Sequence, residues 1–312
     1  MNIMSRFQRS WQLFKSSLFI IARNKQLLVF PIIIFFLTMM IFLFFLAPVV
    51  LRPTGYSYAS AQHWQAISHS LFIQSSPDAA AGSGSRVGLT AGAIVYLAFL
   101  YFVSMFFATF FNVAFYHEIL AALGGQPVSI ARGLKFAGTK WKLVLMWALF
   151  AGLVGLIIRQ LEERLSFVGR IIARFIGIAW SIAAVFVIPI IVCEEQNANP
   201  VALRKKSAGI LKRTWGEALI GYVGLGMVSG LMMIASMVFL FGALVGSIVL
   251  NNFWLLAIAG VLWLVAMFVL SYLTSLAGQI YKGALYLYAA SGVVPEPYIQ
   301  EMLDSAWKFK KS

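Results

Sequence analysis

The sequence has little charge and almost no cysteine. Charged residues make up 11% of its 312 residues and hydrophobic residues 61%, whereas soluble domains carry about 25% charged residues. This composition excludes an ordinary soluble domain. The single cysteine, Cys193, excludes an intramolecular disulfide framework, so we expect helix packing to hold the fold together.

Recognisable catalytic and metal-binding motifs are also lacking. The three histidines are His63, His69 and His117, and with one cysteine they form no local zinc ligand set. The segment Gly133–Lys140 resembles a phosphate-binding loop, but its last two residues are in the wrong order and no strand precedes it. We therefore expect no catalytic residue, no metal and no cofactor, and a protein that is not an enzyme.

The sequence does contain six long apolar runs, which begin near Leu27, Leu89, Leu143, Phe175, Ala218 and Phe253. About 20 apolar residues in a helix cross a bilayer. We predict an all-α, polytopic membrane bundle of about six transmembrane helices in three hairpins, forming one integral membrane domain over residues 1–312. The run 143–158 is short, so spans three and four either cross fully or form a half-inserted hairpin.

The positive charge is distributed unevenly along the chain. The net charge is +14, and 18 of the 24 Lys and Arg residues lie in the N-terminal segment, the loops after spans two and four, and the C-terminal segment. Basic residues in short loops between spans indicate topology rather than nucleic-acid binding. This bias predicts a multi-pass protein of the bacterial cytoplasmic (inner) membrane with both termini in the cytoplasm. The run 27–51 is too long for a signal peptide and is interpreted as an uncleaved span.

A basic, aromatic segment precedes each hairpin. We predict an interfacial helix over residues 1–26, hairpins over 27–116, 127–193 and 200–290, and a cytoplasmic tail over 291–312. Pro127 and Pro200 open similar segments that end in a Trp, which indicates a weak internal repeat. The expected partners are the lipid bilayer and its anionic head groups, and either a homo-oligomer or a membrane-protein partner is compatible with the pattern.

Charged residues near the span ends are candidate functional groups. His117 and Glu118 end span two, and Glu194 and Glu195 end span four. These acids either line the mouth of a transport pathway or form salt bridges with the basic segments. Arg159 and Glu163 lie at the opposite membrane face as an i,i+4 pair, which either caps a short span or reaches into it.

Small and polar residues within the spans predict helix contacts. Span five contains two GxxxG motifs, Gly226 with Gly230 and Gly242 with Gly246, a spacing that favours close helix packing. We expect Ser104, Thr109 and Asn112 to hydrogen-bond to neighbouring helices. The loop 52–88 is too small to bury a soluble core, and we expect its aromatic residues and His63 to lie on the membrane surface, ahead of a flexible stretch at 75–85.

One segment carries a resemblance to known families. Val187-Ile188-Pro189 is followed by Glu194-Glu195, then by Pro200-Val201-Ala202-Leu203 and Ser207. With Lys15-Ser16, Pro31 and Trp215-Gly216-Glu217, this pattern resembles uncharacterised bacterial multi-pass membrane families related to the membrane domain of glycerophosphodiester phosphodiesterases. The resemblance implies a helical membrane fold and covers nearly the whole chain. The phosphodiesterase catalytic domain is absent, so its activity does not carry over.

Two functions fit these observations. The first is a transporter or channel for a small solute or lipid, which requires polar residues that face one another inside the bundle. The alternative is a non-catalytic membrane factor that organises lipid or scaffolds partner proteins, which requires no such pathway.

Overall fold

The computed structural model describes residues 3–74, 87–193, 199–300 and 303. Within them the chain forms ten helices and one two-stranded antiparallel sheet. In chain order the elements are α1 (Ile3–Arg23), α2 (Gln26–Val50), α3 (Ala61–Leu71), β1 (Phe72–Gln74), β2 (Val87–Leu89), α4 (Ala91–Leu123), α5 (Ile130–Thr139), α6 (Trp141–Arg164), α7 (Phe167–Ala183), α8 (Val187–Cys193), α9 (Pro200–Val249) and α10 (Phe253–Ser291).

Six helical segments are long and apolar enough to cross a membrane. They are α2, α4, α6, α7 together with α8, residues 232–249 of α9, and α10. The prediction of an all-α membrane protein with six spans is therefore confirmed. Span three is longer than expected, because the charged residues 159–164 continue α6 to 24 residues.

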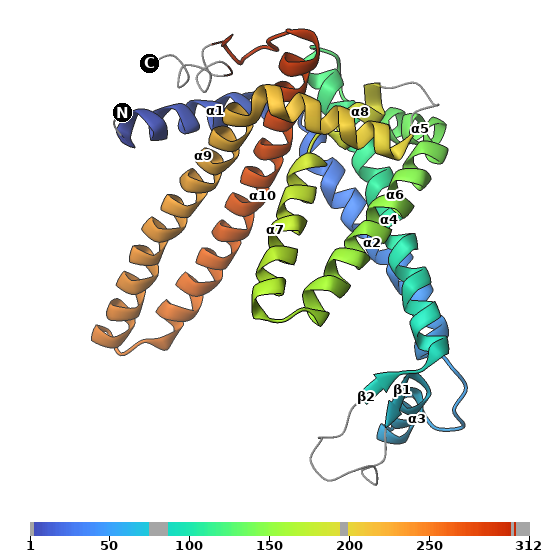
Figure 1. Ribbon diagram of the computed structural model, residues 1–312. Coiled ribbons are helices and arrows are strands. Elements are labelled where there is room, and N and C mark those ends of the chain that lie inside the picture. The colour runs from blue at the N-terminus through green and yellow to red at the C-terminus, as the bar shows by residue number, and fades with distance from the viewer. Residues whose placement is uncertain (1–2, 75–86, 194–198, 301–302, 304–312) are drawn as a thin grey trace.

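Three helical segments lie across one end of the spans. They are α1, α5 and the first part of α9, and the C-terminal end of α10 lies at that same end (Figure 1). We call it the interfacial end and the opposite one the far end. The basic segment that opens at Pro200 and span five form one helix, α9, of 50 residues. Its first part crosses the end of the spans and its second part runs along them (Figure 1).

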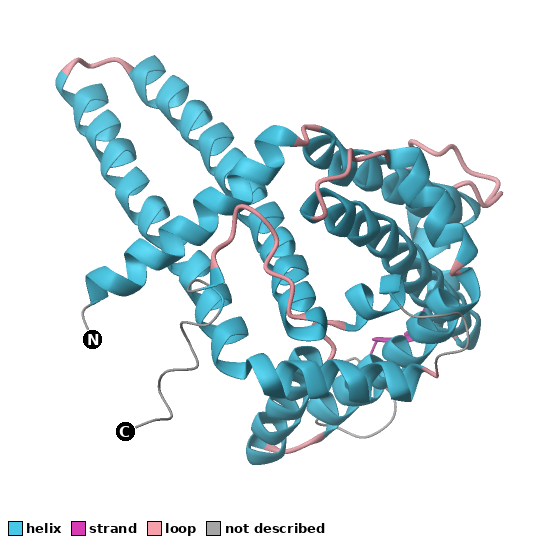
Figure 2. Cartoon of the chain, turned by 90° about the horizontal axis from the view of Figure 1, so that it is seen from above, coloured by secondary structure: helices cyan, strands magenta, loops and turns pink. Residues whose placement is uncertain are grey.

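The hydrophobic core lies at the interfacial end. Its buried residues come from the first turns of α2 and α6 and from the last turns of α4 and α10, including Phe30, Phe115, Leu143 and Tyr281. Large apolar side chains further along the spans are exposed, such as Phe36, Val238 and Phe268. The three hairpins therefore pack together at one end and diverge toward the other (Figures 1 and 2).

A proline accounts for the break between α7 and α8. Pro189 lacks an N–H, and its ring would clash with the carbonyl of Val185 in a continuous helix. The chain accordingly makes a turn at residues 184–186 before α8 begins. The N–H of Phe186, which lies in this turn, donates to the hydroxyl of Ser207 in α9 at 3.1 Å. The break therefore joins span four to the third hairpin.

The segment between α2 and α4 is more structured than the sequence indicated. It contains α3 and the paired strands β1 and β2, which project beyond the far end of the spans (Figure 1). His63 is fully buried, with Nδ1 2.6 Å from the Thr54 hydroxyl and Nε2 3.1 Å from the Val50 carbonyl. The prediction that His63 lies on the membrane surface is wrong, although Tyr56 and Trp64 are exposed; residues 75–85 lie outside the described residues.

Candidate functional site

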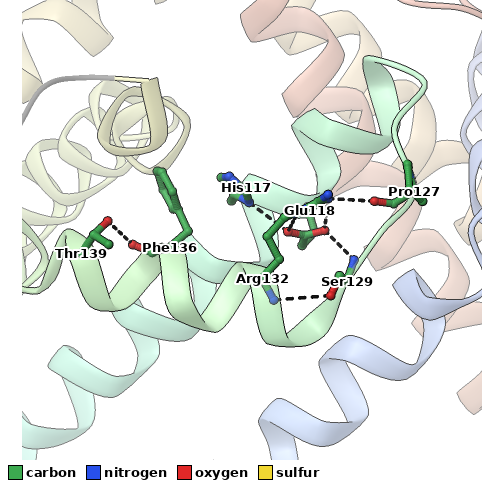
Figure 3. Close-up of polar contacts among 7 residues, drawn as sticks. All are labelled: His117, Glu118, Pro127, Ser129, Arg132, Phe136 and Thr139. Atoms are coloured by element: carbon green, nitrogen blue, oxygen red, sulfur yellow. Dashed lines mark hydrogen bonds and ion pairs between the residues drawn. The ribbon is translucent and has the colours of Figure 1, made fainter.

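A buried carboxylate joins the end of span two to the first interfacial helix after it. The Glu118 side chain is 0% exposed and accepts hydrogen bonds from Arg132 Nε at 3.0 Å and Nη2 at 2.6 Å, and from the Ser129 backbone N–H at 2.7 Å. His117 Nδ1 lies 2.9 Å from the same carboxylate (Figure 3). A two-point arginine–carboxylate pair fixes orientation as well as distance, so Glu118 sets how α5 lies on α4.

The local sequence explains why α5 begins beside Glu118. Gly125 adopts φ +76°, a conformation that glycine allows without strain, and turns the chain after α4. Ser129 then caps α5, since its hydroxyl accepts from the Arg132 N–H. The Pro127 carbonyl accepts a further bond from Arg132 Nη2 at 2.8 Å, which holds the guanidinium over the carboxylate.

A glycine permits the close approach of α5 to α4. A Cβ at Gly133 would lie 2.7 Å from the Ala114 carbonyl oxygen, 3.0 Å from Glu118 Cγ and 3.3 Å from a ring carbon of Phe30. The first of these is a backbone atom, which a rotamer change does not move. Gly133 is therefore the residue that lets the Glu118–Arg132 pair form.

The remaining contacts enclose the pair further. The His117 ring stacks on Phe136 with ring centres 4.0 Å apart, and Lys140 Nζ lies 5.8 Å from the Phe136 ring centre. The hydrogen bonds that Arg132 donates to Glu118 raise the pKa of the guanidinium above its ordinary value, so the arginine stays charged. The side chains around Glu118 and Arg132 bond or stack with one another. This arrangement is suited to fixing α5 on α4 rather than to passing a solute.

The other two interfacial helices place a buried serine where α5 has Gly133. Ser207 of α9 is fully buried and accepts from the Phe186 N–H beside span four. Ser17 of α1 is also fully buried, and its hydroxyl lies 2.7 Å from that of Tyr298, just after span six. Each helix thus contacts the end of a hairpin through a small residue.

The burial pattern around these serines repeats. In α1 the buried positions include Leu13, Ser17, Ile20 and Ile21, and in α9 they include Leu203, Ser207, Ile210 and Leu211. Both sets have offsets of 0, 4, 7 and 8, which form one helical face. In α5 the buried Gly133 and Ala137 occupy offsets 4 and 8. The common pattern supports the internal repeat that the opening prolines indicated.

The contact between Ser17 of α1 and Tyr298, just after α10, gives a stability prediction. Burial raises the pKa of the Tyr298 hydroxyl, which stays neutral. Tyr298→Phe should lower the free energy of unfolding by about 1 kcal/mol, because one buried hydrogen bond is lost while Ser17 keeps its bond to the Leu13 carbonyl. Denaturant titration in detergent checks this, with the exposed Tyr56 changed to Phe as control. Equal loss in both variants would contradict the assignment.

A second charged cluster lies at the far end, around the α6–α7 turn. Arg159 Nε donates to Glu163 at 2.9 Å, and Arg174 donates to Glu162 at 3.2 Å. A cavity of 610 Å³ opens between the two helices, lined by Gly155, Ile158, Arg159, Glu162, Glu163 and Arg170. The i,i+4 pair predicted from the sequence forms, and the structure adds Arg170 and Arg174, which sequence reasoning counted only as charges of the loop.

The glycines of span five make little close contact within the chain. A Cβ at Gly230 or Gly242 would meet no atom within 4 Å, and one at Gly246 would lie 3.6 Å from Leu255. Neither Gly230 nor Gly242 is thus at a close helix crossing inside this chain. Gly226 lies in α9, but its surroundings are outside the part of the chain described. Close helix packing through the GxxxG glycines stays a prediction.

Other predicted contacts differ from the structure or lie outside it. Thr109 and Asn112 donate to the carbonyls of Met105 and Ala108 in their own helix, so the expected bonds to neighbouring helices are wrong for both. Glu194 and Glu195 lie outside the described residues. Among the residues described, no group of three or more His, Cys, Asp or Glu side chains is placed to hold a metal ion.

The six apolar spans and the helices laid across their interfacial end define an integral, multi-pass helical membrane protein. A model of a family of unknown function (DUF6159) matches residues 90–295, more than half of the chain, and the protein belongs to that family. Neither the curated proteins nor the solved structures contain a match. The match supports membership of an uncharacterised family, while the relation to glycerophosphodiester phosphodiesterase membrane domains stays an expectation.

Proposed function

We propose that this protein is a non-catalytic membrane factor that binds and orders bilayer lipid between its three hairpins. The observation that carries the proposal is the one-ended core: buried side chains gather at the interfacial end, while apolar side chains along the diverging spans are exposed. In a bilayer such surfaces are covered by acyl chains. The lipid bilayer and its head groups are the proposed partners.

The polar side chains described in the spans favour this proposal over a transporter. Thr109, Asn112 and Ser181 each donate to a carbonyl one turn earlier in their own helix. Each of these bonds directs a side-chain donor to its own helix rather than across the bundle to another span. Glu118, a candidate pathway residue, is enclosed by its protein partners.

The experiment compares lipid restriction with solute flux. In reconstituted vesicles, spin-labelled phospholipid should report more motionally restricted lipids per protein than a compact six-span protein of the same size does. A panel of small solutes should cross the vesicles no faster than they cross protein-free ones. A restricted-lipid number equal to that of the compact control, or protein-dependent flux of any solute, would count against the proposal.

We further propose that the interfacial end faces the cytoplasm of a bacterial inner membrane. The 18-to-6 distribution of Lys and Arg supports this orientation, because the basic segments α1, α5 and the first part of α9 all lie at this end (Figure 1).

A labelling experiment tests the orientation. Single cysteines at Lys135 and at Gln65, both exposed positions, are introduced in a Cys193→Ser background. A membrane-impermeant thiol reagent added to intact cells should label the Gln65 position and leave the Lys135 position unlabelled until the membrane is opened. Labelling of Lys135 in intact cells would reverse the orientation.

A further inference from the structure

The α6–α7 turn around the far-end cavity carries an excess of positive charge, while the cavity lining itself holds two arginines and two glutamates. Residues 159–174 contain four arginines and two glutamates. Each glutamate is already paired, Glu163 with Arg159 and Glu162 with Arg174. The guanidinium of Arg170, which lines the cavity, has no ion pair among the residues that the structure describes. Since each lining glutamate is offset by an arginine, the charge of Arg170 is the one that an anion in the cavity would neutralise.

Arg159 also keeps hydrogen-bond capacity toward the cavity. A guanidinium has five N–H donors, and the bond to Glu163 uses Nε. Its terminal nitrogens remain available beside Arg170. Arg159 and Arg170 both line the cavity, and a pair of arginines is suited to a phosphate, whose several oxygens can accept bonds from both.

The position of the cavity along α6 matches the phosphate layer of a membrane. Arg159 follows Trp141, the first residue of α6, by 18 positions, or about 27 Å at the helical rise. The hydrocarbon of a bilayer is about 30 Å thick. With Trp141 at one interface, Arg159 and the cavity lie at the level of the phosphates in the opposite leaflet.

Apolar and small residues complete the surroundings. Ile157, Ile171 and Phe175 are exposed beside the charged residues and offer apolar surface at the depth of acyl chains. Gly155 lines the cavity, and a Cβ there would lie 3.3 Å from the Tyr101 hydroxyl, so the glycine keeps room open. The far-end loops otherwise carry few basic residues, as the positive-inside rule expects, and four arginines in one short turn depart from that rule.

We infer that the far-end cavity binds the phosphate of an anionic phospholipid in the leaflet opposite the interfacial helices, with Arg170 and Arg159 as its ligands. The inference rests on the proposed lipid-binding function and adds a head-group class and a site. The two arginines contact the phosphate oxygens, and the exposed apolar residues of α6 and α7 contact the acyl chains.

Native mass spectrometry of the full-length protein tests the site. Phosphatidylglycerol and phosphatidylcholine with identical acyl chains are compared as added lipids, and inorganic phosphate is added in a separate arm. Arg170→Gln and Arg159→Gln should each weaken phosphatidylglycerol retention by about tenfold, since each loses charge-assisted bonds to the phosphate. Arg52→Gln, an exposed arginine away from the cavity, is the matched control and should leave retention unchanged.

Several outcomes would overturn the inference. One is unchanged phosphatidylglycerol retention in the Arg170→Gln and Arg159→Gln variants, and another is equal retention of the two lipids by the wild type. The third is full displacement of lipid by inorganic phosphate, which would assign the cavity to the free ion. The count of restricted lipids separates this result from the proposed function. If the protein orders bilayer lipid but has no head-group site in the cavity, the number of restricted lipids in Arg170→Gln equals that of the wild type.

Discussion

Glu118→Gln should destabilise the protein by about 3 kcal/mol, as expected when one partner is removed from a buried ion pair. The Glu118 side chain is 0% exposed and Arg132 is 39% exposed, so the arginine regains some water and the loss falls at the low end of the range. This loss is larger than the cost of breaking an exposed ion pair. The smaller cost would be expected if Glu118 lay on the surface of the interfacial end. Denaturant titration of the purified protein measures the change.

Two further variants make this result specific. Arg132→Gln combined with Glu118→Gln should cost little more than the single change, because the two residues act as a unit. Glu163→Gln, in the exposed pair with Arg159, is the control and should leave the transition unchanged within error. A fully additive double variant, or a Glu118→Gln variant as stable as the wild type, would show that the pair does not hold α5 on α4.

Gly133→Ala should lower the free energy of unfolding by about 2 kcal/mol, within the range for an overpacked core. The added Cβ would lie 2.7 Å from the Ala114 carbonyl oxygen, so the backbones of α4 and α5 must separate. Gly138→Ala in the same helix is the matched control. Its Cβ meets no atom within 4 Å, so helix propensity alone should make that variant more stable, by about 0.5–1 kcal/mol.

The two alanine variants therefore shift stability in opposite directions if α5 is packed as described. Thermal unfolding in detergent measures both shifts under identical conditions. Two stabilised variants would mean that α5 lies free of α4, and two destabilised variants would mean that both glycines are needed for another reason.

Much of the fold could be predicted from the sequence because membrane spans depend on local composition. Each run of about 20 apolar residues becomes a helix whatever its neighbours are, since no other conformation satisfies its backbone in lipid except a closed barrel. The basic residues before Trp141 and the prolines at 127 and 200 marked the interfacial segments for similarly local reasons. The end of α6 was missed, because helix continues beyond the apolar run into charged residues.

The candidate site depended on contacts that sequence does not encode locally. Glu118 and Arg132 lie 14 positions apart, and their pairing depends on the turn at Gly125 and on the missing side chain of Gly133. The buried Ser17 and Ser207 had a usable signal, since Leu, Ser and Ile recur at the same offsets in both helices. For the GxxxG motifs, spacing alone does not tell whether a glycine faces a helix or lipid, so close packing through them stays a prediction.

The central claim is that lipid, and neither water nor protein, covers the diverging spans. The most direct measurement is spin-label accessibility in lipid nanodiscs at Phe175, Phe239 and Phe268, which lie on α7, α9 and α10 and are all exposed, with the fully buried Ile280 as reference. Collisions with oxygen, which concentrates in acyl chains, should be frequent at the first three positions, and collisions with a water-soluble nickel complex rare. Frequent nickel collisions at these positions would reveal a water-filled pathway, and rare collisions with both reagents would reveal a tightly packed bundle; either result would contradict the account.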